Sequence, residues 1–255
     1  TIRNNWIANI TKFAENFKPF EGHFDTEQLV ILNLGNNNYL QGFIDLLQYN
    51  DDGTVSIFDW KTSSAFVGEH LIEAGRQLVA YKKALEQEGL RVKDCAWVML
   101  KYYEATWIQK NGKPKSKNGE WRNLINDLKL PIMRFLTESE MDEFDCEATY
   151  ESALAANDIN ELPTEVVQNF DIHPYIRYYE INEEVEAECM QYINDTIKLF
   201  EEYGTDGRNF PHCDIDKQSF FCNALCGYGG KSELCKYWCA FCNSFSKDDE
   251  EEDFF

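Results

Sequence analysis

The chain has 255 residues, of which 44% are hydrophobic, and it carries a formal net charge of −21. This length can bury one good core with an appended module, and no run approaches the ~18 to 20 apolar residues that a membrane-spanning helix needs. With no signal peptide at its start, the chain is expected to be soluble and intracellular. The acidic charge argues against non-specific capture of DNA, because a duplex presents a dense line of negative phosphates.

The first predicted elements are a helix over residues 4–17 and a strand over residues 27–34, EQLVILNL, which begins at Glu27. Two short apolar runs follow, separated by the turn sequence Asn-Asp-Asp-Gly at residues 50–53. This pattern predicts a β-hairpin over residues 42–63.

Charged residues lie at the ends of the two hairpin strands. Asp59 and Lys61 project from one face because side chains alternate along a strand, and the pairing can bring Asp45 to that face. Two neighbouring carboxylates repel each other, and a cation such as Mg²⁺ removes that repulsion. Lys61 could then hold an attacking water, as in a metal-dependent phosphodiesterase. The alternative is that these are ordinary polar residues on an exposed sheet edge.

Residues 67–88 are predicted to form a helix from the spacing of their apolar positions. Gln77 and Tyr81 lie one turn apart on this helix and therefore share a face.

Together, these motifs (G-x-x-D, a hairpin, D-x-K, then Q-x-x-x-Y on the next helix) resemble the PD-(D/E)XK nuclease superfamily, and within it the RecB-like branch. The matching residues are Gly42, Asp45, Asp59, Lys61, Gln77 and Tyr81. The resemblance covers residues 20–100 firmly. It implies an α/β (α+β) fold with a mixed, mainly antiparallel core sheet flanked by helices.

The resemblance also implies roles for these residues. Asp45 and Asp59 would bind Mg or Mn with help from the Trp60 carbonyl, and Lys61 would position the nucleophile. Gln77 and Tyr81 would line the DNA channel or support Lys61, and Glu27 would have a supporting role.

One element of the family pattern is missing from the sequence. Family members usually carry a His or Glu on a preceding helix that completes the metal site, and only His23 and Glu15 are nearby candidates here. The chain starts at Thr1 without a methionine, which leaves open whether an upstream segment carries the ligand.

Residues 110–122, KNGKPKSKNGEWR, carry four lysines and one arginine against a single glutamate. Glycine and proline predict a loop here. Either it is a solvated hairpin tip or it is an arm that contacts phosphates.

The next part of the chain is predicted to be helical over residues 123–158, with a strand over 174–181 and a helix over 183–203. Cys95, Cys146 and Cys189 are expected to be small core residues in these elements rather than ligands.

Six further cysteines fall within 30 residues near the C-terminus, which in an intracellular chain argues for a bound metal rather than disulfides. They are Cys213, Cys222, Cys226, Cys235, Cys239 and Cys242. Several RecB-like nucleases hold a [4Fe-4S] cluster with such cysteines, and by this resemblance Cys222, Cys226, Cys235 and Cys213 would bind it. Zinc is the alternative, because Cys239 and Cys242 form a C-x-x-C knuckle.

The chain ends in SKDDEEEDFF, an acidic run with two phenylalanines. Such a run is either a solubilising tail or a segment that docks on a replication protein, such as a polymerase or helicase, as the tails of single-stranded-DNA-binding proteins do. The predicted organisation is a nuclease-like core (residues 1–205), a cysteine-rich metal-binding module (206–245) and a flexible acidic tail (246–255).

The resemblance implies a Mg- or Mn-dependent DNA exonuclease of phage or viral replication and recombination, acting in the cytoplasm (the host cytoplasm if a phage encodes it). The alternative is a catalytically inactive, nuclease-derived binding subunit that docks on a replication complex through its acidic tail.

Overall fold

The computed structural model describes residues 2–18, 20–63 and 66–204. The chain divides into two units, Thr1–Gln191 and Tyr192–Phe255, and only residues 192–204 of the second are described. None of the helices described is both long and apolar enough to cross a membrane. The cysteine-rich segment and the acidic tail lie outside the described residues.

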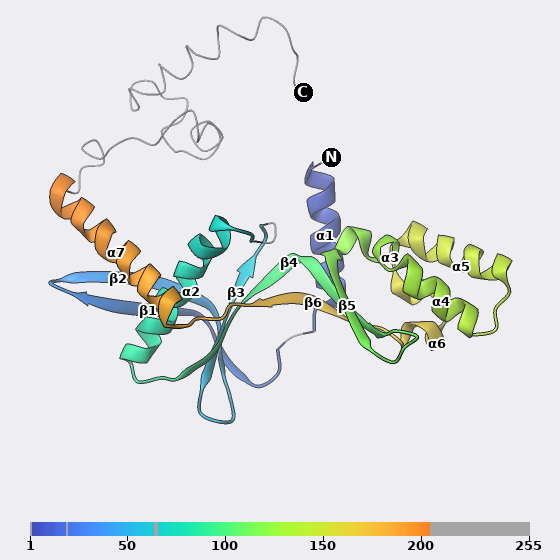
Figure 1. Cartoon of the computed structure of the whole chain (residues 1–255), viewed down its shortest axis with the longest axis horizontal. Coiled ribbons are helices and arrows are strands. Elements are labelled where there is room, and N and C mark those ends of the chain that lie inside the picture. Colours follow the sequence, from blue (N-terminus) through green and yellow to red (C-terminus); the bar gives the residue numbers. More distant parts are fainter. Residues whose placement is uncertain (1, 19, 64–65, 205–255) are drawn as a thin grey trace, which may run out of the picture. The chain divides into compact units, whose positions relative to one another are not determined.

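Figure 1 shows the elements along the chain. In order they are α1 (Ile2–Asn16), β1 (His23–Gly35), β2 (Asn38–Tyr49), β3 (Val55–Lys61), α2 (Glu69–Gln87), β4 (Val92–Ile108), β5 (Pro114–Glu120), η1 (Trp121–Asn123), α3 (Leu124–Asp127), α4 (Lys129–Glu138), α5 (Glu143–Ala156), η2 (Ile159–Glu161), α6 (Thr164–Val167), β6 (Asp171–Tyr178) and α7 (Glu183–Tyr203).

The described strands of the first unit form one mixed sheet of six strands. Strands β1 to β5 are neighbours in chain order, and β6 pairs with β4. All pairings are antiparallel except that of β3 with β4, which are joined through helix α2. The predicted mixed, mainly antiparallel sheet flanked by helices is therefore confirmed.

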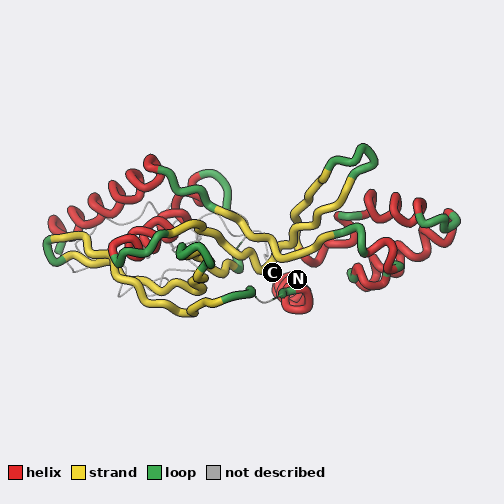
Figure 2. The backbone as a smooth tube through the Cα atoms, turned by 90° about the horizontal axis from the view of Figure 1, so that it is seen from below, coloured by secondary structure: helices red, strands yellow, loops and turns green. Residues whose placement is uncertain are grey.

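Strand β4 has two different neighbours on the same side. Its first half pairs with β3 from Ser56↔Asp94 to Lys61↔Met99, and its second half pairs with β5 from Tyr102↔Glu120 onward. In Figure 2 the β4–β5 hairpin is the pair of strands, joined by a loop, that projects from the other strands. Strand β5 thus begins pairing with β4 just beyond the point where β3 stops.

The two faces of the sheet carry separate apolar clusters. One cluster packs under α2 and includes Ile44, Ile57 and Trp97, all fully buried. The other packs against α1 and the helices after β5, and includes Phe58 and Trp121. Neighbouring residues such as Ile57 and Phe58 serve opposite clusters, as strand alternation requires.

Several predicted elements are confirmed within a few residues: the N-terminal helix, the hairpin, the helix that carries Gln77, the acidic helical region and α7. The hairpin turn forms where predicted, since Gly53 N donates to Asn50 O. The predicted core cysteines, Cys95, Cys146 and Cys189, are all buried.

Three predictions differ in part from the structure. The lysine-rich stretch is a loop only up to Lys113 and then forms strand β5, because its backbone pairs with β4 and Pro114 occupies the first strand position, where a missing N–H is tolerated. Glu27 does not begin a strand, because β1 starts at His23 through pairing with Tyr49. The strand predicted at 174–181 is β6, displaced to 171–178.

Candidate active site

The candidate site lies at the end of the β2–β3 pair, on the face covered by α2. Antiparallel pairing of Leu46 with Phe58 brings Asp45 and Asp59 to neighbouring positions. Asp45 Oδ2 accepts a hydrogen bond of 2.8 Å from the Trp60 backbone N–H. The backbone of one strand thus fixes the carboxylate of the other.

Asp59 is a buried acid, with 2% of its surface exposed. The Lys61 ammonium lies 2.5 Å from Asp59 Oδ2, yet that oxygen accepts no hydrogen bond of good geometry. Burial raises the pKa of Asp59, the Lys61 charge opposes the rise, and the nearby Asp45 charge adds to it. Burial of this carboxylate is costly unless cations offset it.

A chain of polar contacts leads from Lys61 into helix α2. Lys61 Nζ donates to Gln77 Oε1 at 3.0 Å, and Gln77 Nε2 donates to the Tyr81 hydroxyl at 2.8 Å. Gln77 and Tyr81 are one helical turn apart, so both reach the same end of β3. The amide of Gln77 therefore orients the ammonium of Lys61.

The absence of a side chain at Gly42 allows the Tyr81 ring to pack against β2. A Cβ atom at Gly42 would lie only 2.5 Å from Tyr81 Cε1, so the ring packs directly on the backbone of β2. This close approach gives the glycine of the G-x-x-D motif a packing function.

Trp60 is held from the opposite face of the sheet by three phenylalanines that the sequence interpretation had given no role. Its ring lies 5.6 to 6.4 Å from the rings of Phe13, Phe17 and Phe20. Because Trp60 N–H binds Asp45, this aromatic cluster supports the carboxylate from behind. Phe13 lies on α1 and Phe17 directly after its end, and their spacing of four residues was the available signal.

Glu27 lies across from Asp45 on β1, between the paired positions Thr26↔Leu46 and Gln28↔Ile44. Its backbone has φ of 52°, a left-handed conformation that costs a non-glycine residue energy. Its exposed carboxylate contributes to the raised pKa of Tyr81, after burial and the charges of Asp59 and Asp45.

The two candidates for the missing metal ligand are engaged elsewhere. The His23 ring lies 4.8 Å from that of Tyr49, and Glu15 pairs with Lys12 at 3.0 Å. Within the described ranges, no group of three or more His, Cys, Asp or Glu side chains could together hold a metal ion.

The donor set nevertheless fits Mg²⁺ or Mn²⁺. Mg²⁺ is commonly bound by one or two carboxylates and takes its remaining ligands from water and phosphate. Asp45 and Asp59 supply two carboxylates, and the buried Oδ2 of Asp59 retains lone pairs. A bound cation would also offset the unfavourable burial of the Asp59 charge.

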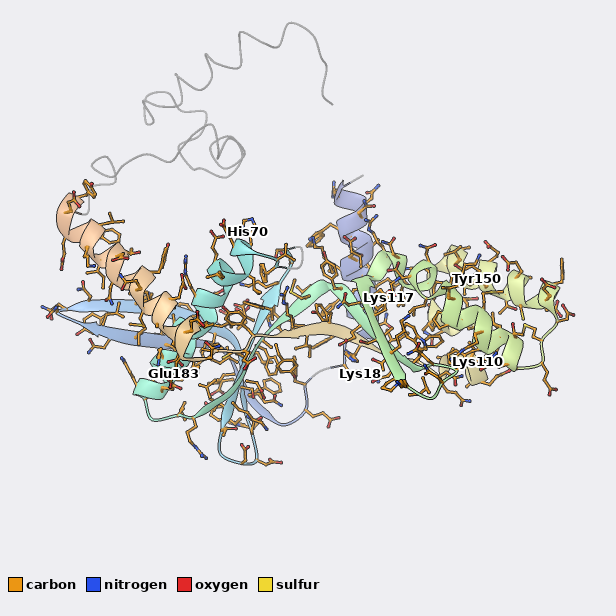
Figure 3. The ribbon with its side chains drawn as sticks, in the orientation of Figure 1. Lys18, His70, Lys110, Lys117, Tyr150 and Glu183 are labelled. Atoms are coloured by element: carbon orange, nitrogen blue, oxygen red, sulfur yellow. The ribbon has the colours of Figure 1, made fainter. Side chains whose placement is uncertain are left out.

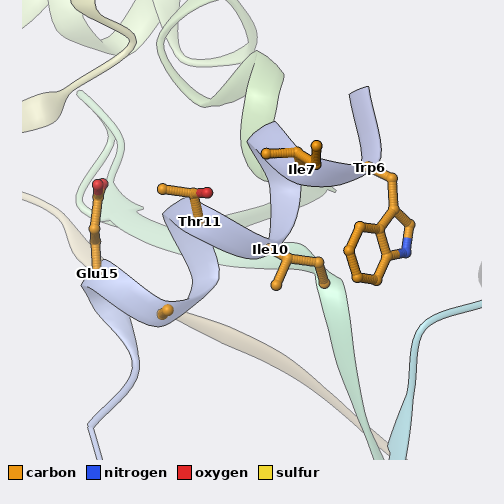
Figure 4. Close-up of a pocket in the computed structure, with 6 residues that line it drawn as sticks. Trp6, Ile7, Ile10, Thr11 and Glu15 are labelled. Carbon is orange, nitrogen blue, oxygen red and sulfur yellow. The ribbon is translucent and has the colours of Figure 1, made fainter. Parts of the chain in front are cut away.

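An apolar groove elsewhere on the molecule does not belong to this site. It has a volume of about 530 Å³ and runs along α1 between Trp6 and Glu15 (Figure 4). None of the residues predicted for catalysis lines it.

The model of one protein family, the PD-(D/E)XK nuclease superfamily, matches residues 5–219. The chain belongs to this superfamily, whose members are generally metal-dependent nucleases that typically use Mg or Mn and bind DNA. No curated protein matched the chain in a comparison of sequences.

Proposed function

We propose that this chain is a Mg- or Mn-dependent DNA exonuclease of the RecB-like branch, acting in phage or viral DNA replication and recombination. The observation that carries the catalytic part is the contact chain from Asp59 through Lys61 and Gln77 to Tyr81. The RecB-like part is supported by Gln77, which contacts Lys61 from the next helix, and by Tyr81, which contacts Gln77. The Asn-rich, acidic composition favours a phage or viral source, with the host-cell cytoplasm as its location.

In this proposal Asp45, Asp59 and the Trp60 carbonyl would hold the cation, which would supply charge stabilisation to the phosphate and lower the pKa of water. Lys61 is the catalytic lysine that positions the attacking water and faces the charge that develops on phosphate. Gln77 and Tyr81 are positioning residues, because they act through the Lys61 ammonium. Burial beneath α2 keeps this ammonium in one place, which favours catalysis more than a mobile charge would.

The experiment compares linear DNA with closed circular DNA, each incubated with the full chain and Mn²⁺, Mg²⁺ or EDTA. An exonuclease releases nucleotides from a linear duplex or single strand and leaves closed circles intact. Separate 5′ and 3′ end labels give the polarity. Cleavage of closed circles would contradict the exonuclease proposal, and no cleavage with either metal would contradict the catalytic one.

The inactive binding subunit remains the second candidate. The observation that favours it is the lack of a third metal-binding side chain in the described part of the chain. In this alternative the chain docks on a replication protein through its acidic tail. A wild-type chain that binds DNA but cleaves nothing with either metal would select it.

We further propose that Cys213, Cys222, Cys226 and Cys235 bind a [4Fe-4S] cluster, with zinc as the alternative. The support is the density of thiols in a segment too poor in aliphatic residues to form its own core. Anaerobic purification followed by iron, sulfide and zinc analysis distinguishes the two. Cys226→Ser and Cys235→Ser should each release metal, and unchanged metal content in both would contradict this site.

A further inference from the structure

The β4–β5 hairpin gathers positive charge in an otherwise acidic chain. Residues 109–119, QKNGKPKSKNG, contain four lysines and no acid, whereas the whole chain has 45 acids against 24 lysines and arginines. We call this segment the lysine hairpin. All four lysines are exposed, and Figure 3 labels the first and last of them, Lys110 and Lys117.

The root of the lysine hairpin is fixed on the protein. Lys117 Nζ donates to the Asp127 carbonyl at 3.0 Å and lies 3.3 Å from its carboxylate. The Tyr103 hydroxyl donates to the same carboxylate at 3.0 Å, and Gly119 allows both groups to pack closely on β5. One lysine therefore anchors the hairpin to α3.

The other three lysines have no such engagement. Among the described residues no carboxylate lies within ion-pair distance of Lys110, Lys113 or Lys115, and Lys115 lies over the Trp107 ring at 5.9 Å. Like charges close together on one hairpin repel, so this arrangement costs stability unless an anion is bound. Three unpaired cations on a fixed support are suited to an extended polyanion.

The position of the lysine hairpin along β4 sets an upper limit to its distance from Lys61. Lys61 pairs with Met99 and the hairpin tip begins at Ile108, nine residues further along the same strand. At about 3.3 Å per residue the tip lies at most about 30 Å from Lys61. This is the length of roughly nine base pairs at about 3.4 Å each.

We propose that the lysine hairpin binds the phosphate backbone of DNA at a position up to nine base pairs from the phosphate that is cleaved. This inference rests on the proposed function for the identity of the polyanion. Phosphate contacts position DNA without reading its sequence, so the hairpin sets affinity and substrate length rather than base preference.

The test uses Lys110→Gln, Lys113→Gln and Lys115→Gln combined in the full chain, with Lys117 kept because it anchors the hairpin. The matched control replaces three exposed lysines outside the hairpin by glutamine: Lys18, Lys93 and Lys198. Both variants carry the same net charge. Binding is measured by fluorescence anisotropy in EDTA, on duplexes of six and thirty base pairs, at 50 to 200 mM salt.

Each lost phosphate contact lowers the slope of log affinity against log salt by about 0.9. For the hairpin variant on the long duplex, the magnitude of this slope should therefore be smaller by about 2.7. When salt is lowered from 200 to 50 mM, the affinity of this variant should accordingly rise about 40-fold less than that of the control variant. On the short duplex, which spans less than the upper limit of about 30 Å between Lys61 and the hairpin tip, the hairpin variant should lose less of this slope. Equal slopes for hairpin and control variants on the long duplex would overturn the proposal.

The same measurement separates this inference from the proposed function. If the salt dependence of DNA binding changes with the hairpin lysines in a chain that cleaves no DNA, the hairpin assignment is retained and the catalytic proposal is rejected. Cleavage without a hairpin-dependent slope would do the reverse. Loss of binding by the hairpin variant to anionic lipid vesicles, with DNA binding unchanged, would assign the hairpin to a membrane and overturn the proposal.

Discussion

The candidate active site and the lysine hairpin use charge in opposite ways. Asp59 and Lys61 are packed beneath α2, where each depends on the other and on Gln77 for its position. The lysines of the hairpin tip are exposed and have no carboxylate of the described residues within ion-pair distance. Charge inside the protein is sensitive to geometry at short distance, whereas exposed charge acts over a range that salt limits. Substitutions should therefore have steep, specific effects at the first region and graded, salt-dependent effects at the second.

The largest effect is expected from Asp59→Asn and Lys61→Met. Each should lower the rate of Mn²⁺-dependent cleavage of linear DNA by about 10³-fold or more, because each removes charge stabilisation that is needed in the transition state. The folded state should persist, since both side chains remain similar in size. Single-turnover rates and thermal unfolding measure the two quantities, and a variant that folds and retains more than a tenth of the activity would remove its residue from the site.

Gly42→Ala should have the next largest effect. The new methyl group would overlap the Tyr81 ring, and such overpacking typically costs about 1 to 3 kcal/mol. The contact between Gln77 and Tyr81 should be displaced, which lowers the cleavage rate through Lys61.

A double-mutant cycle identifies Tyr81 as the cause. In a Tyr81→Ala background the overlap is absent, so Gly42→Ala should then cost less than about 0.5 kcal/mol. An equal cost in both backgrounds would contradict the packing function of Gly42.

A smaller effect is expected from deletion of residues 246–255, which removes six acids and two phenylalanines. If this run competes with DNA for the lysine hairpin, truncation should tighten binding severalfold at 50 mM salt and much less at 200 mM. The gain should vanish in the hairpin variant. Superimposable titrations of truncated and full-length protein at both salts would leave the run as a solubilising tail.

The smallest effect concerns Glu120 at the hairpin root. The hydrogen bond from Arg122 (2.6 Å) lowers its pKa below 4.5, burial opposes the shift, and the Asn9 amide (3.0 Å) supports it. The folded state therefore releases this proton more readily than the unfolded chain, so its contribution to stability is present above pH 4.5 and is lost as pH falls through the lowered pKa.

Glu120→Gln should remove this part of the pH dependence. The expected difference in unfolding free energy is about 0.5 kcal/mol, because the pair is partly exposed to solvent. Urea unfolding at pH 3.5 and pH 6 measures it, with Glu140→Gln as an exposed control. If the unfolding free energy falls more between pH 6 and pH 3.5 for the variant than for the wild type, the role given to Glu120 is contradicted.

The sequence predicted the centre of the site better than its surroundings. The hairpin turn and strand alternation suffice to bring Asp45 toward Asp59, and helical spacing puts Gln77 beside Tyr81. The spacing of Phe13 and Phe17 indicates a shared face but not its contact with Trp60, because these rings and Phe20 reach Trp60 only when α1 packs on the sheet. Strand β5 was missed for a similar reason: polar residues carry no hydrophobic pattern, and only pairing with a distant strand orders them.

The pairing of Thr106 with Asp171 has a consequence for the history of the fold. It brings together the two ends of the segment that contains the lysine hairpin and helices α3 to α6. A segment whose ends adjoin can be gained or lost between neighbouring strands without moving the strands that carry Asp45 and Asp59. Residues 107–170 can therefore vary in length or structure while the strands that carry Asp45 and Asp59 keep their pairing.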